Sequence, residues 1–150
     1  MERIKNIAIV AHDNCKKTML EFVENQFDIL VHHNLFGTGT TGGLVEELLQ
    51  KKCAAADSAP FCGVHKMKSG PLGGDQQLGG LIADGKIDVL IFFWDPMEPQ
   101  PHDVDVKALL RLAVLYNIPT ASNLSSAEFL ISSPLFKTEY EIRDAGFMKK

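Results

Sequence analysis

The stretch Val89-Leu90-Ile91-Phe92-Phe93-Trp94 decides the fold. It is apolar from end to end, and Asp88 and Asp95 bound it. A strand covered on both faces shows such a continuous apolar run, whereas a strand with one solvated face alternates between apolar and polar residues. The run therefore predicts a central strand of a sheet that has helices on both sides.

The rest of the chain alternates between short apolar runs and helical periodicity. Strands are predicted at 7–10, 35–36, near 64, at 89–94 and at 120–122, and helices over 19–27, 45–49, 78–82, 106–114 and 125–131. Asp103 is the predicted N-cap of the fourth of these helices, and Ser125 with Glu128 predicts a capping box for the last. The repeated order predicts an α/β fold, a doubly wound and mainly parallel five-stranded sheet with helices on both faces.

Composition and charge indicate one globular domain spanning residues 1–150. Fifteen Lys and Arg against nineteen Asp and Glu give a formal charge of -4, so no broad positive field favours nucleic acid. An anionic ligand would need a local arrangement of donors. The longest apolar run is far shorter than the about 20 residues of a membrane span, so no membrane segment is expected.

The number and spacing of the cysteines indicate the redox state of the compartment in which the protein works. Cys15, Cys53 and Cys62 are odd in number and lack a C-x-x-C spacing. This pattern favours neither a disulfide framework nor a zinc knuckle. The predicted compartment is the reducing cytoplasm.

Polar residues cluster where the predicted strands end. In doubly wound sheets, ligands bind outside the carboxyl ends of the strands. The polar segments at these positions are His12-Asp13, Thr38 to Gly42, Ser69 to Gln77, and Asp95 to Asp105. We therefore expect the chemistry of the protein at this edge.

The segment Gly37 to Gly42 joins three glycines and three threonines between a strand and a helix. Backbone N–H groups and hydroxyls can converge there on a phosphate, to which Lys16 could add a charge. The segment lacks the G-K-[ST] ending of a P-loop and follows the second strand rather than the first. A tight turn with a helix cap is the alternative interpretation.

Two further side chains, Asp75 and His102, could transfer protons. Asp75 follows a segment of small residues that lets the backbone approach a ligand, although Asp75 could equally be a helix N-cap. His102 follows a proline-rich loop and could move a proton between oxygens, with Asp105 orienting it. Alternatively, Asp105 only favours the helix dipole and His102 is a surface histidine. A zinc site built on His12 and His102 lacks ligand spacing, so no metal is expected.

The order of these motifs resembles the methylglyoxal synthase family. The matching segments are Ile7 to Asp13 with Lys16, Gly37 to Gly42, Ser69 to Gln77, Asp88 to Pro96, and Pro101 to Arg111. The strings Gly-Gly-Asp-Gln-Gln and Phe-Phe-Trp-Asp-Pro are more specific than a single glycine loop. The resemblance covers about residues 5–135.

The resemblance implies a homohexameric lyase that converts dihydroxyacetone phosphate to methylglyoxal and inorganic phosphate without a cofactor or metal. It implies that Asp75 is the catalytic base, and that His102, supported by Asp105, polarises the carbonyl and shuttles protons. The residues matching the pocket and the phosphate site are His12, Asp13, Lys16, Thr38, Gly39, Thr40, Thr41, Ser69 and Gly70. The family also has an Arg near its C-terminus that can reach a neighbouring subunit, and Arg143 is the only candidate here.

Two other functions compete with this one. A regulatory domain of the same fold would sense a phosphorylated metabolite without turning it over. Such a sensor needs the threonine loop but not Asp75 and His102 together, so their joint presence favours the enzyme. A dinucleotide-dependent oxidoreductase is less well supported, because no clear acid follows Gly42 by about 20 residues at a strand end.

Overall fold

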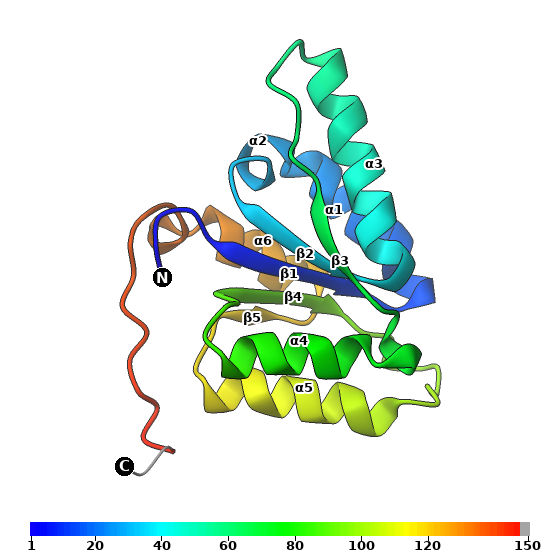
Figure 1. The fold of residues 1–150 in the computed structure, drawn as a ribbon, viewed down its shortest axis with the longest axis vertical. Coiled ribbons are helices and arrows are strands. Elements are labelled where there is room, and N and C mark those ends of the chain that lie inside the picture. Colours follow the sequence, from blue (N-terminus) through cyan, green and yellow to red (C-terminus); the bar gives the residue numbers. More distant parts are fainter. Residues whose placement is uncertain (148–150) are drawn as a thin grey trace.

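A five-stranded parallel sheet forms the centre of the computed structural model, which describes residues 1–147 (Figure 1). Its strands are β1 (Asn6–Ala11), β2 (Asn34–Thr38), β3 (Val64–Met67), β4 (Val89–Phe93) and β5 (Thr120–Ala121). In space they follow the order β3-β2-β1-β4-β5. The chain therefore moves outward from β1 and then returns to its other side, which makes the β1–β4 boundary a topological switch point.

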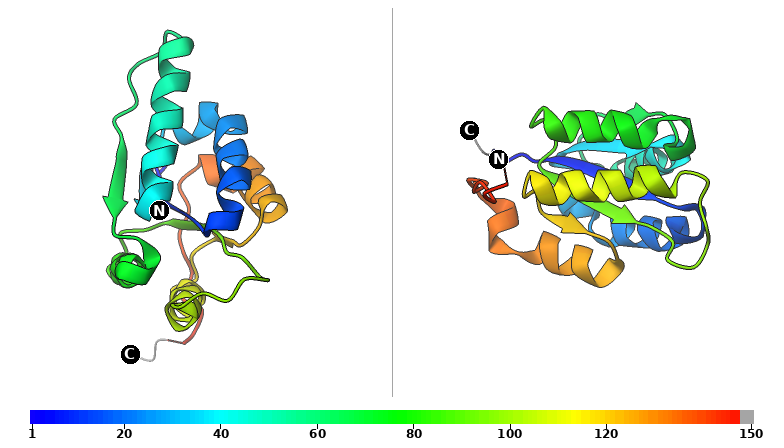
Figure 2. Two further views of the ribbon diagram at one scale, coloured as in Figure 1. Left: turned by 90° about the vertical axis from the view of Figure 1, so that its right-hand side faces the viewer. Right: turned by 90° about the horizontal axis from the view of Figure 1, so that it is seen from below.

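Helices cover both faces of the sheet, as the end-on and lower views show (Figure 2). They are α1 (Lys16–Asn25), α2 (Phe27–Leu30), α3 (Gly39–Ala55), α4 (Gly74–Ala83), α5 (Asp103–Leu115) and α6 (Leu124–Ser132). Helices α1, α3 and α6 share one apolar cluster, and α4 and α5 share the other. The predicted doubly wound fold is confirmed. In the part of the chain that the structure describes, no helix is both long and apolar enough to cross a membrane.

The apolar run in β4 is explained by burial on both sides. Ile91 and Phe93 pack into the cluster under α1 and α3, whereas Leu90 and Phe92 pack into the cluster under α4 and α5. All five β4 residues are buried. Because successive Cβ atoms point to opposite faces, both faces must be apolar, and each large side chain contributes roughly 1.5–3 kcal/mol by its burial.

Two predicted helix caps are wrong by one or two residues. Asp103 is the first residue of α5, not its cap, and its Oδ1 accepts a hydrogen bond from the Gln100 N–H at 3.2 Å. His102 occupies the N-cap position instead. For α6, Asn123 caps the helix by accepting from the Ser126 N–H at 2.9 Å, so no Ser125 capping box forms. Several polar residues at each helix start can cap it, and the path of the preceding loop decides between them.

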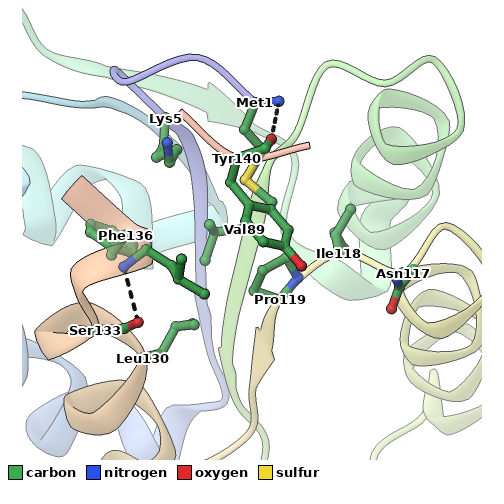
Figure 3. Close-up of a pocket in the computed structure, with 11 residues that line it drawn as sticks. Met1, Lys5, Val89, Asn117, Ile118, Pro119, Leu130, Ser133, Phe136 and Tyr140 are labelled. Carbon is green, nitrogen blue, oxygen red and sulfur yellow. Dashed lines mark hydrogen bonds between the residues drawn. The ribbon is translucent and has the colours of Figure 1, made fainter. Parts of the chain in front are cut away.

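A half-buried histidine lies at the amino end of the sheet, near the residues drawn in Figure 3. The Nδ1 atom of His33 accepts a hydrogen bond from the Lys5 backbone N–H at 3.0 Å, and its ring contacts Phe136 edge-on. Burial, together with the positive charge of Lys5, lowers the pKa of His33 to about 4. The folded protein therefore favours the neutral ring.

We expect the free energy of unfolding to fall as the pH drops from about 6.5 toward about 4. In this window the unfolded chain binds a proton on His33 that the folded chain does not, so stability rises with pH. His33→Gln should lessen this loss by about 1–2 kcal/mol. The full shift in the pKa of His33 would give more, at about 1.4 kcal/mol per pKa unit, but the ring is partly solvated and the effect is correspondingly smaller. Urea unfolding of both proteins across this window measures the effect.

The exposed neighbour His32 supplies the control. His32→Gln removes the same chemical group from the adjacent position and should change the pH dependence only slightly, because the charge of His32 is the smallest of the three causes that lower the pKa of His33. A His33→Gln protein that loses stability with acid as steeply as wild type would show that other groups cause the dependence.

Candidate active site

A small cavity of about 100 Å³ opens at the carboxyl edge of the sheet, beside the switch point. The loops after β1, β2, β3 and β4 all reach it. Of the predicted site residues, those that line it are His12, Asp13, Lys16, Thr38, Gly39, Thr40, Thr41, Ser69, Gly70, Asp75 and His102. Gln100 and Pro71 also line it and were not singled out from the sequence. Gln100 belongs to the polar segment after β4, and that position was the only signal for it.

The threonine loop runs directly into the N-terminus of α3. Gly37 is required here, because a Cβ on it would lie 2.5 Å from the Gly42 Cα. Gly39 has a φ of +52°, a conformation that glycine adopts without strain. The Thr38 side chain makes no capping hydrogen bond to α3. The Gly39 N–H donates to the Lys68 carbonyl at 3.1 Å, and the N–H groups that follow it in the first turn of α3 remain available to an anion in the cavity.

Lys16 links the first and second strand-end loops. Its Nζ donates to the Thr40 Oγ1 at 2.6 Å and to the Asp13 Oδ1 at 2.6 Å. The hydrogen bond from Lys16 lowers the pKa of Asp13, which keeps that carboxylate ionised. This ammonium lies beside the α3 N-terminus and can complete a phosphate site there.

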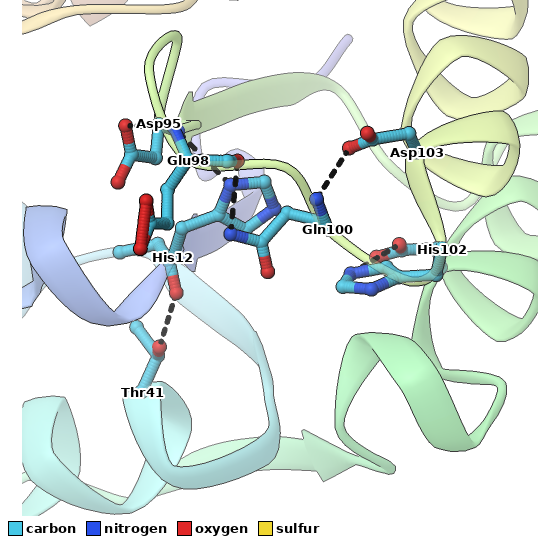
Figure 4. Close-up of polar contacts among 9 residues, drawn as sticks. His12, Thr41, Asp95, Glu98, Gln100, His102 and Asp103 are labelled. Atoms are coloured by element: carbon cyan, nitrogen blue, oxygen red, sulfur yellow. Dashed lines mark hydrogen bonds and ion pairs between the residues drawn. The ribbon is translucent and has the colours of Figure 1, made fainter.

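Thr41 has a different role from Thr40. It is buried, and its Oγ1 donates a hydrogen bond of 3.3 Å to the Ala11 carbonyl (Figure 4). The hydroxyl thereby ties the threonine loop to the end of β1. It holds the N-terminus of α3 in place beside His12.

Glycines allow the third loop to reach the centre of the cavity. A Cβ on Gly70 would lie 2.7 Å from the His102 Nε2 and 3.2 Å from the Asp75 Oδ2. Gly73 precedes α4 with a φ of +99°. Asp75 therefore enters the first turn of α4 as a buried residue rather than as its cap. Gly70 thus lets the backbone approach these two side chains closely, as predicted for this segment.

Asp75 and His102 face one another at the base of the cavity. The His102 Nε2 lies 3.6 Å from the Asp75 Oδ2, and both side chains are buried. Neither the Asp75 Oδ2 nor the His102 Nδ1 has a hydrogen-bond partner among the described residues. Burial raises the pKa of Asp75, an effect that His102 opposes and Asp105 reinforces. A desolvated carboxylate with a raised pKa is a stronger base than a solvated one.

His12 presents a proton donor to the same cavity. The Asp95 backbone N–H donates to its Nδ1 at 2.9 Å (Figure 4), so in the neutral ring the proton must sit on Nε2. Burial, with His102 as a second cause, lowers the pKa of His12 and favours this neutral form. Its Nε2 is buried and has no partner within residues 1–147. Buried polar atoms without partners are rare, and such atoms on three residues of one cavity indicate a missing polar ligand.

The loop after β4 is ordered by Asp95. Its Oδ1 accepts from the Met97 and Glu98 N–H groups at 2.9 and 3.2 Å, and its Oδ2 accepts from the Asn14 amide at 2.7 Å. The same residue fixes the His12 tautomer through its backbone N–H. Asp95 therefore positions both the loop and the imidazole.

Asp105 lies outside this cavity. It lines a neighbouring groove between α4 and α5, together with Asp75. In the described chain, no hydrogen bond joins the Asp105 carboxylate to His102, although the Asp105 N–H donates to the His102 carbonyl at 2.9 Å. Its negative charge raises the pKa of Asp75. The structure thus relates Asp105 to the carboxylate more directly than to the imidazole that it was expected to support.

Two further expectations concern metals and Arg143. Within residues 1–147, no group of three or more His, Cys, Asp or Glu side chains is arranged to hold a metal ion. The Arg143 carbonyl accepts from the Asn117 amide at 3.0 Å. Asn117 precedes β5, so within its own chain this contact ties Arg143 to the amino edge of the sheet, opposite the cavity.

Comparisons with known proteins agree with this geometry. A family model described as an MGS-like domain matches residues 18–122. Methylglyoxal synthase from Maridesulfovibrio salexigens is 65% identical over 149 residues, which cover 98% of this chain and 95% of that protein. The enzyme of the same name from Proteus mirabilis is 55% identical over 139 residues, 93% of this chain and 84% of its own.

A solved structure of the same family has the same fold as this chain. The crystal structure of methylglyoxal synthase from Elizabethkingia anophelis aligns with a TM-score of 0.79 at 46% identity, over 96% of this chain and 89% of that one. Sequence and structure thus agree over nearly the full length, and the chain belongs to the methylglyoxal synthase family.

Proposed function

We propose that this cavity converts dihydroxyacetone phosphate to methylglyoxal and inorganic phosphate. One observation carries the proposal: a buried carboxylate and two buried imidazoles, all with unpartnered polar atoms, share a cavity with an open helix N-terminus. The helix end suits the phosphate of the substrate, and the other three groups suit its carbonyl and hydroxymethyl end. Relatives named methylglyoxal synthase support the same reaction.

The phosphate would bind at the threonine loop. The N–H groups that follow Gly39 in the first turn of α3, the Thr40 hydroxyl and the Lys16 ammonium can all donate to its oxygens. Ser69 and Gly70 bound the opposite wall of the cavity. This arrangement fixes one end of a three-carbon substrate and turns the other end toward Asp75.

Asp75 would then remove a proton from the hydroxymethyl carbon. Its Oδ2 is not engaged by any described donor, so its lone pair is free for this transfer. The electrons of the C–H bond form the enediolate, and the carbonyl oxygen gains negative charge. Stabilisation of such an oxyanion by fixed donors in a dry site is typically worth about 2.7–4 kcal/mol per donor.

His102 and His12 are the candidate donors to that oxygen. The neutral His12 can donate from Nε2 without first gaining a proton. We assign to His102 the transfer of protons between the two enediol oxygens. Asp105 would act on Asp75 through its charge.

Elimination completes the reaction without a redox step. Once the proton has moved from the former hydroxymethyl oxygen to the former carbonyl oxygen, the electrons left on the hydroxymethyl oxygen form an aldehyde carbonyl. The carbon–carbon double bond then shifts to join the central carbon to the phosphate-bearing carbon, and the C–O bond to phosphate breaks, so that phosphate leaves with those electrons. The resulting enol of methylglyoxal takes up a proton on its terminal carbon. Atoms and charge balance with no oxidant, metal or cofactor.

A sensor that only binds a phosphorylated metabolite is the alternative function, and it is not favoured. It would explain the threonine loop but not the unpartnered Asp75 and His102. Incubating the pure protein with dihydroxyacetone phosphate and assaying methylglyoxal tests the choice. Absence of product over a range of pH and enzyme concentration would support the sensor.

We also propose a homohexamer and a cytoplasmic location. The family resemblance supports the first. The second is supported by Cys15, Cys53 and Cys62, all of which are free thiols.

Inorganic phosphate, a product of the reaction, should bind the free protein and raise its melting temperature. At about 100 times its dissociation constant it adds about 2.7 kcal/mol per site, and about 1 kcal/mol corresponds to roughly 2–4 °C in a chain of this size. Thr40→Ala and Lys16→Met should each shrink this rise, because they remove a hydroxyl and a cation from the phosphate site. Thermal unfolding with and without phosphate measures it.

Lys17→Met is the matched control. Lys17 is the exposed neighbour of Lys16, so the same substitution there should leave the response to phosphate unchanged. If Thr40→Ala and Lys16→Met both respond like wild type, phosphate binds elsewhere and the assignment of the threonine loop is wrong.

A further inference from the structure

A second cavity, of about 230 Å³, lies at the opposite edge of the sheet from the active site (Figure 3). It is bounded by the amino end of β4, the end of α6 and the segment from Ser133 to Tyr140. The Met1 amino nitrogen donates to the Tyr140 carbonyl at 2.9 Å, and the Tyr140 N–H donates back to the Met1 carbonyl, which closes one side. The six residues of β1 separate the two edges by about 20 Å, so this cavity is independent of the catalytic one.

The walls are mainly apolar. Val89, Ile118, Leu130 and Phe136 supply aliphatic and aromatic surface, and Figure 3 shows them around a common space. A cavity of about 150 Å³ with such walls is large enough to bind benzene. The present cavity can therefore hold a ring or a short branched chain that also carries a small polar group.

One buried cation contributes to this apolar space. Lys5 lines the cavity with only 1% of its surface exposed. Its Nζ donates to the Thr138 carbonyl at 2.5 Å and to the Glu2 carbonyl. An ammonium has three N–H donors, and these two carbonyls accept from two of them, so one N–H of Lys5 Nζ can still donate to another acceptor.

No carboxylate in the part of the chain that the structure describes forms an ion pair with this ammonium. Within residues 1–147, the ion pairs involve other lysines and His102, not Lys5. The charge of Lys5 contributes to the lowered pKa of the nearby His33, so its field extends into the surrounding protein. A buried charge without a counterion is costly, and an anion from solution would offset that cost.

We propose that this cavity binds a small monocarboxylate with an apolar body. Its carboxylate accepts the remaining Lys5 N–H, and its body contacts the apolar walls. A monoanion fits better than a phosphate, because most of the wall is apolar and, among residues 1–147, the cations that line the cavity are Lys5 and the Met1 ammonium, which already donates to the Tyr140 carbonyl. The active-site cradle has the opposite character, with hydroxyls and an open helix end.

Benzoate is the probe that tests the proposal, and benzyl alcohol is its neutral counterpart of similar shape. Calorimetry on the wild-type protein with saturating phosphate should show benzoate binding, with benzyl alcohol at least tenfold weaker. Lys5→Met, which keeps the apolar stem and removes the charge, should weaken benzoate at least tenfold and leave turnover unchanged. Lys16→Met makes the same change in the active site and should leave benzoate affinity unchanged.

Methyl resonances locate the bound probe. Those of Ile118 and Leu130 should shift with benzoate, whereas phosphate should not shift them. If Lys5→Met does not fold, the comparison of benzoate with benzyl alcohol on wild type still decides. Equal affinity for the two probes, no benzoate binding, or displacement of benzoate by phosphate would each overturn the proposal.

Discussion

Asp75→Asn is expected to lower turnover by about 10⁴-fold, the upper end of what general acid–base groups contribute, while phosphate still binds. The amide has nearly the shape of the carboxylate but cannot accept a proton from carbon. The proposed phosphate site uses Lys16 and Thr40, whereas Asp75 faces His102. Steady-state assays of methylglyoxal formation, with thermal unfolding in phosphate, measure the two halves of the prediction.

Stability provides an independent readout for the same variant. Burial raises the pKa of Asp75 in the folded protein, so the fold disfavours the ionised carboxylate. The protonated Asp75 side chain therefore stabilises the fold relative to the ionised one, and this contribution is lost as the pH rises above the unfolded-state pKa of about 3.9. The asparagine removes this cost, so the variant should melt at or above the wild-type temperature at pH 7. An inactive variant that is also less stable would point to a structural role.

A matched control separates the base from carboxylates in general. Asp84 is exposed and follows the last turn of the same helix, α4. Asp84→Asn should leave turnover unchanged. Near-wild-type activity of Asp75→Asn would exclude Asp75 as the base.

The sheet could be predicted from the sequence because burial of a strand on both faces requires an apolar residue at every position. The continuous apolar run of β4 packs on both sides, and that pattern admits few other structures. The edge that carries the cavity followed from the same reasoning, because parallel strands end together. Local periodicity thus determined both the architecture and the place of the site.

Contacts between distant segments could not be predicted in this way. Lys16 reaches Thr40 because α1 and α3 lie on the same face of the sheet, and Gly70 passes close to His102 because α4 and α5 share the other. The tautomer of His12 depends on a backbone N–H 83 positions away, at Asp95. Spacing along the chain contains no such information. The position of Asp105, outside the cavity but beside Asp75, was missed for the same reason.

His102→Gln is expected to lower kcat by about 10²–10⁴-fold, with a smaller change in KM. Glutamine can still donate a hydrogen bond from the same region, but it cannot exchange a proton between two oxygens at neutral pH. The loss should therefore fall on the steps after proton abstraction. Assays over a range of substrate concentration separate kcat from KM, and His32→Gln, at an exposed position, is the control that should change neither.

The exchange of substrate hydrogen with solvent gives the sharper test of His102. Asp75 lies on α4 and is buried. In this variant it should therefore still remove the proton from the hydroxymethyl carbon of the substrate. With proton shuttling impaired, the enediolate returns to substrate more often than it expels phosphate. In deuterated water, His102→Gln should label dihydroxyacetone phosphate faster than it forms methylglyoxal, whereas Asp75→Asn should do neither. If His102→Gln changes only KM, His102 holds the ground state of the substrate and does not take part in the chemical steps.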